Sequence, residues 1–346
     1  MLRRAARPDG PSSVVTDRPG SNQLQEPLFT YIFENTNSYM GVEMLSRRSL
    51  LTAGSAATLV SLAPRRILAK RALGAASLTT LSDGYLTLPG DFIFGEMPQD
   101  SLATVLAEFG QDRDQLTPEC NLALYQDGTH TVLFDVGSGP DFMPTAGAIA
   151  DSLDAAGLGP EDVTHVVFTH AHPDHIWGLL DDFDDLLFPE AAYFMGRDEW
   201  DYWWDPDTVN TIGDARAAFA VGAKRRMEVI EETVTRFEDG DEILPGIAAV
   251  ASHGHTPGHM SFEVRNGGDA VLILGDAIGN HHVAFRKPGW RSGSDQDADR
   301  AVATRLALFD RIRADDLAVV GFHLPEGGFG QVDTLGDGYV FAPEGL

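Results

Sequence analysis

Three of the chain's eleven histidines, together with one aspartate, fall between His170 and His175, directly after the apolar run 163–169. In extended backbone alternate side chains point the same way, so His170 and His172 can converge on one ion. Asp174 and His175 follow Pro173, where the chain turns, and can face a second ion. Imidazoles and carboxylates suit zinc and other borderline divalent ions. We therefore expect a metal site at the end of this strand rather than a histidine-rich surface turn.

Apolar runs that break into glycine or polar turns alternate with helical patterns from about Leu78 onward. This order predicts an α/β fold with chemistry at the ends of strands. The predicted strands include 131–134, 163–169, 246–251, 270–274 and 317–320, and the predicted helices include 211–234 and 302–312.

The segment His-x-His-x-Asp-His after an apolar strand resembles the metallo-β-lactamase superfamily. The resemblance implies four further motifs, and each occurs in order: Asp135 in LFDVGSG, His255 in SHGHTPGH, Asp276 in LILGDA and His323 in VGFHLP. The match covers about residues 78–346. It implies a four-layer αβ/βα sandwich with the metals at one edge, where strand ends converge.

The resemblance also implies which residue binds which metal. The first metal would be held by His170, His172 and His255, and the second by Asp174, His175 and His323, with Asp276 bridging them. Asp135 would instead orient the histidine loop through hydrogen bonds. His259 is expected to support the site rather than bind metal, and His253 is the rival to His255.

Two divalent ions about 3.5–4 Å apart can share a hydroxide that attacks a carbonyl or phosphoryl centre. Zinc is the first expectation, with manganese, iron and cobalt open because no thiolate ligand is present. Asp276 and Asp174 are the expected catalytic carboxylates, Asp174 helping to move the proton. The resemblance thus implies a metallo-hydrolase.

The expected substrate is a small carboxylic ester or lactone, acyl-homoserine lactones included. The alternative is a phosphotriesterase, because 81–84 and 249–259 resemble the methyl parathion hydrolase group. A non-catalytic metal-binding protein ranks lower, because its ligand motifs would be broken. Some acyl-homoserine lactonases carry a tyrosine where this chain has Gly279, so that assistance to ring opening is not expected here.

Aromatic side chains near the motifs are expected to shape an apolar pocket, which suits an acyl chain or aryl group. The dense cluster 200–204 is expected at a rim or partner surface. The candidate pocket residues are Phe92, Phe94, Trp177, Trp200, His281 and Phe285.

Residues 44–76 have the three parts of a twin-arginine signal peptide. Arg47 and Arg48 precede the apolar stretch 51–64, which is shorter than the ~18 residues of a membrane span, and small residues follow. The signal predicts a periplasmic protein without stable membrane insertion. Residues 1–43 are polar and aperiodic, and we expect a disordered or wrongly assigned extension. The hydrolase domain is expected at 77–346.

The net charge of −27 would repel phosphate backbones, so nucleic acid is not an expected partner. Homodimers are common in the family that the chain resembles. Cys120 is the only cysteine, which excludes an intrachain disulfide and a cysteine-rich metal cluster.

Overall fold

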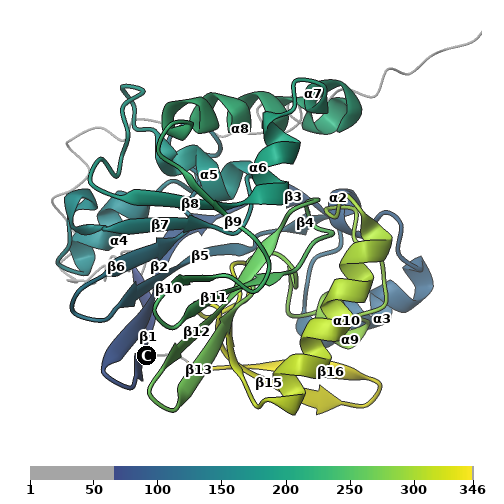
Figure 1. Ribbon diagram of the computed structural model, residues 1–346. Coiled ribbons are helices and arrows are strands. Elements are labelled where there is room, and N and C mark those ends of the chain that lie inside the picture. Colours follow the sequence, from purple (N-terminus) through teal and green to yellow (C-terminus); the bar gives the residue numbers. More distant parts are fainter. Residues whose placement is uncertain (1–65, 345–346) are drawn as a thin grey trace, which may run out of the picture.

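The computed structural model describes residues 66–344. In this part of the chain, two seven-stranded sheets stack face to face, and helices cover both outer faces (Figure 1). The predicted α/β fold, a four-layer αβ/βα sandwich, is confirmed. Residues 1–43, the predicted extension, lie outside the described residues, as does most of the predicted signal.

The first sheet has the strand order β1-β2-β5-β6-β7-β8-β9 and the second runs from β10 to β16 in sequence order. The strands of the first sheet are β1 (Ile67–Leu73), β2 (Ala76–Tyr85), β5 (Glu119–Gln126), β6 (Thr131–Phe134), β7 (His165–Phe168), β8 (Ala192–Gly196) and β9 (Thr235–Phe237). Those of the second are β10 (Glu242–Leu244), β11 (Ile247–Ala251), β12 (Met260–Asn266), β13 (Asp269–Ile273), β14 (Ala318–Val320), β15 (Phe329–Leu335) and β16 (Gly338–Pro343).

Helices form the two outer layers and one extra lobe. The first sheet is covered by α4 (Ile149–Ala155), α5 (Pro173–Ile176), α6 (Arg197–Trp204), α7 (Thr208–Thr211) and α8 (Ala217–Ile230), and the second by α9 (Val283–Arg286) and α10 (Ala298–Ala314) (Figure 1). The lobe combines β3 (Leu88–Pro89), α2 (Gly90–Phe94), α3 (Gln99–Phe109) and β4 (Gln115–Leu116). Short 3-10 turns occur at η2 (Pro160–Asp162), η3 (Trp177–Leu179) and η4 (Asp214–Arg216).

The hydrophobic core is divided into clusters that lie between the layers of the sandwich. Phe134, Val167, Phe262 and Ile273 are buried in the cluster between the two sheets, and the alternation of side chains along each strand leaves the other face for the helices. A second cluster packs the first sheet against α5, α6 and α8, and a third packs the second sheet against α10. No helix of residues 66–344 is both long enough and apolar enough to cross a bilayer.

The strand directions bring the sequence motifs together. β6 to β9 run parallel to one another, and β13 runs parallel to β14. The carboxyl ends of parallel strands meet at one edge of a sheet. Asp135 directly follows β6, His170 follows β7, and Asp276 and His323 follow β13 and β14. These four motifs therefore converge on one edge of the sandwich.

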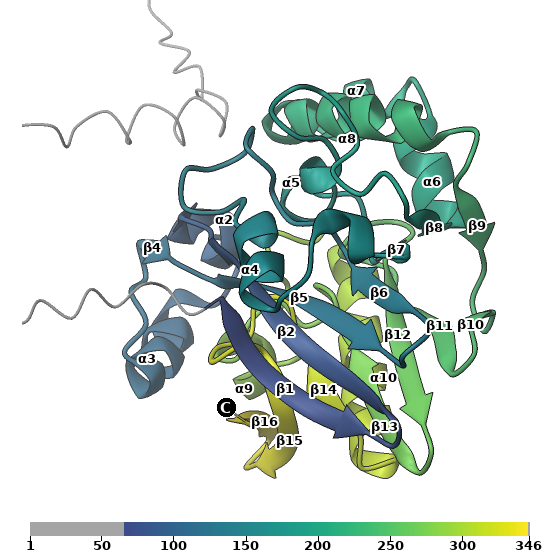
Figure 2. The same cartoon turned by 90° about the vertical axis from the view of Figure 1, so that its left-hand side faces the viewer.

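The domain begins earlier than the sequence suggested. β1 pairs antiparallel with β2 from Leu73↔Ala76 back to Ile67↔Leu81, at the edge of the first sheet (Figure 2). Leu73 is fully buried and Ala69 nearly so. The boundary predicted at residue 77 is therefore wrong by about ten residues, because charged residues interrupt the apolar pattern of this edge strand and make it resemble the end of a signal.

Removing β1 should weaken the domain. We compare a chain that starts at Ser77 with one that starts at Arg66. The free energy of unfolding of the shorter chain is expected to be lower by at least about 2 kcal/mol, because the burial of Leu73 and Ala69 is missing. For a domain of this size the loss corresponds to a melting temperature lower by roughly 5 °C. Thermal unfolding of both chains tests this, and equal melting temperatures would contradict it.

Candidate metal centre

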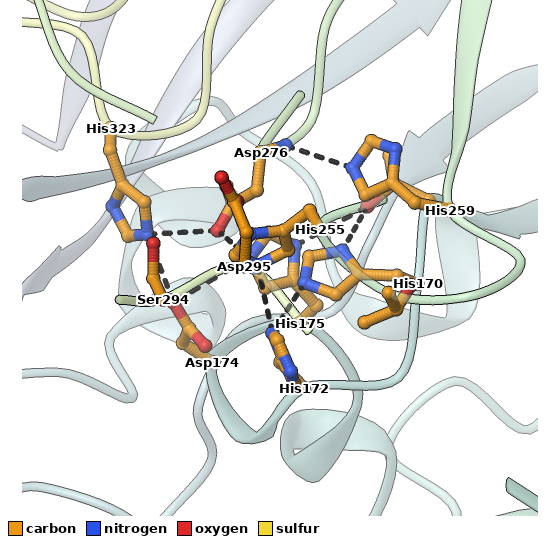
Figure 3. Close-up of polar contacts among 12 residues, drawn as sticks. His170, His172, Asp174, His175, His255, His259, Asp276, Ser294, Asp295 and His323 are labelled. Atoms are coloured by element: carbon orange, nitrogen blue, oxygen red, sulfur yellow. Dashed lines mark hydrogen bonds and ion pairs between the residues drawn. The ribbon is translucent and has the colours of Figure 1, made fainter. Parts of the chain in front are cut away.

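Three buried histidines turn one ring nitrogen each toward a common point at the edge of the sandwich. His170 Nε2 lies 3.0 Å from His172 Nδ1, which lies 2.9 Å from His255 Nε2. His170 and His172 come from the loop after β7, and His255 comes from the turn between β11 and β12 (Figure 3). Three inward imidazole nitrogens form the face that a divalent ion takes.

A second group of ligand atoms lies beside the first and is richer in carboxylates. Asp174 Oδ2 lies 3.2 Å from His323 Nε2 and 3.5 Å from His175 Nε2. His175 Nε2 also lies 3.5 Å from Asp276 Oδ1. One donor atom from each of these four residues lies within 4.8 Å of the others.

Asp276 stands between the two groups. Its Oδ2 lies 3.3 Å from His255 Nε2 in the first group and 3.4 Å from His323 Nε2 in the second (Figure 3). The backbone N–H of Asp276 donates to His259 Nε2 over 3.0 Å, and His259 Nδ1 contacts Ser252 Oγ. His259 therefore fixes the loop that carries the carboxylate, the supporting place that the sequence suggested.

The outward nitrogen of each histidine is fixed by a neighbour. A partner that accepts a hydrogen bond keeps the proton on the outward nitrogen and leaves the inward lone pair for a metal, whereas the Gln296 amide nitrogen at His172 holds the ring in place without choosing this tautomer. The pairs are His170 Nδ1 with Thr169 Oγ1 at 3.0 Å, His172 Nε2 with the Gln296 amide at 3.2 Å, His175 Nδ1 with Asp135 Oδ2 at 2.8 Å, His255 Nδ1 with Asp295 Oδ1 at 3.1 Å, and His323 Nδ1 with the Glu119 carbonyl at 2.8 Å.

The residues present fit a metal. Two inward atoms, His175 Nε2 and Asp276 Oδ1, are buried and have no hydrogen-bond partner within residues 66–344. Buried polar atoms of this kind are costly unless a ligand satisfies them. The donors are imidazole nitrogens and carboxylate oxygens, a set typical of divalent metal sites. His253 is not in either group and instead contacts Arg300.

The protein environment gives the two groups opposite affinities for protons. Burial, helped by the neighbouring imidazoles, lowers the pKa of His170 and of His172 well below the ordinary histidine value. Burial acts against charge at His175 too, but Asp174, Asp276 and Asp135 outweigh it and raise the pKa of His175 to about 10. Burial is likewise outweighed at His323, mainly by Asp276, and its pKa lies well above the ordinary value.

Metal loading should therefore release protons mainly from the second group. At pH 7 the metal-free protein keeps His175 and His323 protonated, so binding there is expected to release about two protons, whereas His170 and His172 are already neutral. Calorimetric titrations in two buffers of different ionisation heat measure the number released. Replacing His323 by alanine, which breaks the second group, should abolish most of this release, and heats that do not depend on the buffer in the native protein would contradict the assignment.

Asp135 does not face the metal groups directly. Its backbone adopts a φ of 63°, a left-handed conformation that aspartate tolerates better than most residues. Its carboxylate accepts hydrogen bonds from the backbone N–H and the hydroxyl of Thr169, and it contacts His175 Nδ1. The structure thus places Asp135 where it orients the histidine loop.

Glu199, in α6, was not singled out from the sequence. Its buried carboxylate accepts two hydrogen bonds at Oε1, from Ala171 N at 2.9 Å and Trp203 Nε1 at 2.5 Å. At Oε2 it accepts two more, from Thr256 Oγ1 at 2.6 Å and Gly258 N at 3.1 Å. Ala171 separates His170 from His172, and Thr256 follows His255, so this carboxylate ties the two ligand loops together.

Asp295 is the other supporting residue without a sequence signal. It contacts His255 through Oδ1 and pairs with buried Arg305 through Oδ2, the latter at 3.0 Å. Arg305 in turn donates to the carbonyls of Pro288 and Trp290. These contacts join positions far apart in the sequence, and no local pattern marks them.

A cleft opens onto both metal groups and encloses about 1270 Å³ of space, part of it open to solvent. Most of its walls are apolar. Its lining includes Leu86, Leu88, Phe92, Ile93, Met97, Leu116, Phe142, Phe219, Val283 and Trp290, with His281, His282 and Arg216 among the polar groups.

Only part of the predicted pocket lies on these walls. Phe92 and His281 line the cleft as predicted. Phe94, Trp177, Trp200 and Phe285 are instead buried in the hydrophobic clusters under the helices and do not line it. Burying such large apolar surfaces is favourable enough to place them in the core.

The rim predicted for residues 200–204 is also wrong in part. Trp200 and Trp203 are each 1% exposed, and Tyr202 and Trp204 pack partly buried against the same core. The intervening acid, Asp201, faces solvent. α6 therefore directs its tryptophans into the core and Asp201 into solvent, as an amphipathic helix does.

Two proteins of known sequence are similar to this chain over more than half of its length. A protein of Mycobacterium tuberculosis described as uncharacterized is 29% identical over 239 residues, which are 67% of this chain and 95% of that protein. The N-acyl homoserine lactonase AttM of Azorhizobium caulinodans is 33% identical over 192 residues, 54% of this chain and 67% of AttM.

Two solved structures share the architecture. The hydrolase AbOPH, described as a member of the beta lactamase superfamily, matches with a TM-score of 0.73 and 26% identity, over 80% of this chain and 96% of that one. AidC, described as a dizinc quorum-quenching lactonase, matches with a TM-score of 0.76 and 23% identity, over 82% and 99%. At that identity the second likeness concerns the fold alone.

A family profile gives the assignment directly. Residues 118–323, more than half of the chain, match the metallo-beta-lactamase superfamily. This range begins just before β5 and ends at His323, so it includes all seven candidate ligands. The chain belongs to the metallo-β-lactamase superfamily.

Proposed function

We propose that this protein is a dinuclear metal-dependent hydrolase that cleaves a carboxylic ester or lactone, with N-acyl homoserine lactones among its substrates. The observation that carries the proposal is Asp276, whose Oδ2 lies within 3.4 Å of a histidine nitrogen from each group. A carboxylate in that place can serve two ions at once. We propose zinc for both, and manganese, iron and cobalt suit the same donors.

Bound divalent ions would activate a water molecule and polarise the carbonyl of the substrate. The protein's own part is to hold the donors and to handle the proton. Asp174 lines the cleft, and its Oδ2 is directed at His323. Its other oxygen, Oδ1, is then available to take a proton from the attacking water and return it to the leaving alkoxide.

The apolar walls support an acyl substrate. Leu86, Leu88, Phe92, Ile93 and Met97 line the same cleft as the metal groups, and such a surface suits an alkyl chain better than a charged one. The likeness to the lactonase AttM, at 33% identity, supports a lactone as the group that is opened.

A phosphotriester is the second candidate. Residues 249–259 of this chain read AVASHGHTPGH and resemble the methyl parathion hydrolase group. A two-metal centre can act on phosphoryl as well as carbonyl centres.

The test compares initial rates of one preparation, loaded with zinc or manganese, on a long-chain N-acyl homoserine lactone and on a methyl phosphotriester. Rapid lactone opening with only a trace of phosphotriester turnover would support the lactonase. The reverse result would make the protein a phosphotriesterase. If neither substrate reacted although two ions were bound, the substrate assignment would fall.

We also propose that the protein is exported to the periplasm by the twin-arginine route. Arg47 and Arg48 before an apolar stretch support this. Since β1 begins at Ile67, cleavage should occur before that residue. Fractionation of cells that express the whole chain, with Arg47→Lys/Arg48→Lys as the matched control, tests the route. Periplasmic protein that persists in the double variant would contradict it.

A further inference from the structure

Arg216, at the end of η4, lines the same cleft as the metal groups. Its Nη2 donates to the carbonyl of Gly293 over 2.6 Å, and its guanidinium carbon lies 5.6 Å from the centre of the Phe92 ring. Its Nε is buried and has no hydrogen-bond partner within residues 66–344. Arg305, the other arginine of the cleft, also has a buried Nε without a partner, but its charge is paired with Asp295, whereas no carboxylate among residues 66–344 forms an ion pair with Arg216.

The surroundings of Arg216 place it close to the metal centre. Phe219, one helical turn further on, has its ring 5.9 Å from that of His172. Gly293 belongs to the segment 292–297, in which Asp295 and Gln296 contact the metal-site histidines His255 and His172. Arg216 therefore stands between these histidines and Phe92 of the apolar wall.

An arginine in this position calls for a hydrogen-bond acceptor. The guanidinium has five N–H donors, of which the Gly293 carbonyl uses one, so the donors that face the cleft remain for a substrate oxygen. Apolar side chains line much of the same cleft, and Phe92 lies beside Arg216, so an alkyl chain has a surface to pack on next to the arginine. The net charge of −27 disfavours an anionic substrate and favours a neutral carbonyl.

We propose that Arg216 forms an acceptor subsite that binds the carbonyl oxygen of an acyl amide, located in the substrate between the scissile ester or lactone and an alkyl tail. The inference rests on the proposed function, since the scissile group must lie at the metal centre. It adds that the enzyme distinguishes an acylamido lactone from a lactone that carries only an alkyl chain.

The test uses two lactones of similar size, N-hexanoyl homoserine lactone and γ-decanolactone, which lacks the amide. The variant Arg216→Met keeps a long side chain and removes every donor. It is expected to lower kcat/KM for the acylamido lactone about 10- to 100-fold, mostly through KM, the loss typical of a hydrogen bond to a charged group. For γ-decanolactone the change should stay below about 3-fold.

Arg225→Met is the matched control, because Arg225 lies on the exposed face of α8 and pairs with surface carboxylates. It should leave both rates unchanged. Arg216→Lys, which keeps the charge without the planar fork, should recover only part of the loss. Equal losses on both lactones in Arg216→Met, or no loss on either, would overturn the subsite.

A binding measurement separates this inference from the proposed function. If the native protein opened neither lactone, the lactonase assignment would fail, but binding of N-butylhexanamide to the metal-loaded protein could still be measured by calorimetry. Weaker binding in Arg216→Met by 10-fold or more would keep the subsite, and unchanged binding would overturn it. If hexanoate bound more tightly than the amide, and if this binding were lost in Arg216→Met, the preferred ligand of Arg216 would be an anion. That result would overturn the proposed amide subsite.

Discussion

Replacing Asp276 by alanine is expected to lower kcat by at least about 1000-fold, with metal lost from both groups. The carboxylate stands between His255 and His323, with Oδ2 3.3 and 3.4 Å from their inward nitrogens, and no other carboxylate among residues 66–344 is placed between the two groups in this way. A rate loss of this size corresponds to about 4 kcal/mol of transition-state stabilisation, within the range that metal ions supply.

Asp310→Ala is the matched control for this experiment, because Asp310 is exposed on α10, away from the cleft. It should keep native activity and native metal content. Metal content is measured by elemental analysis on the same samples as the rates. An Asp276→Ala protein that retained both ions and more than a tenth of native activity would show that Asp276 is not shared between the groups.

The second large effect concerns Glu199, whose carboxylate is 0% exposed and accepts four hydrogen bonds. Glu199→Gln keeps the shape of the side chain but turns an NH₂ group toward two donors. The expected loss of unfolding free energy is about 3 kcal/mol, because buried donors are left without acceptors. Metal affinity should fall about 10- to 100-fold, as is usual when a residue that orients metal ligands is changed.

The loss of metal affinity in Glu199→Gln should differ between the two metal groups. Glu199 holds the loops of His170, His172 and His255, so the first group should lose affinity while the second keeps it. Glu228→Gln, on the exposed face of α8, provides the control with the same chemical change. Equal weakening of both groups would indicate general destabilisation, and native affinity at both would contradict the positioning role.

The fold and the clustering of the seven candidate ligands could be predicted because their signals are local. The segment from His170 to His175 follows a strand directly, and Asp135, Asp276 and His323 likewise come just after apolar runs. Strand ends collect at one edge of a parallel sheet, so residues that are distant in sequence could be assigned to one site. Each pattern spans fewer than a dozen residues.

The supporting residues could not be found in that way. Glu199 reaches Ala171 across 28 positions and Gly258 across 59, and Asp295 reaches His255 across 40. Such contacts depend on how α6 and the segment before α10 pack onto the sheets. A glutamate beside tryptophan in a helix carries no sign that its carboxylate is buried.

The prediction of the pocket residues was partly wrong for a related reason. Aromatic type and closeness to a motif suggested Phe94, Trp200 and Phe285, but exposure decides which rings face a cleft, and all three are at most 1% exposed. Arg216, which does line the cleft, lies 41 positions after His175 and has no motif of its own. Periodicity identifies the buried face of a helix, but not which surface a substrate meets.

The most direct test of the two-metal centre is the number of ions bound per folded chain, measured by elemental analysis after loading with zinc and removal of excess metal. We expect about two ions in the native protein. We expect about one ion in His170→Ala and about one in His323→Ala, because these variants break different groups. One ion or fewer in the native protein, or the loss of neither ion in these variants, would contradict the two-metal centre.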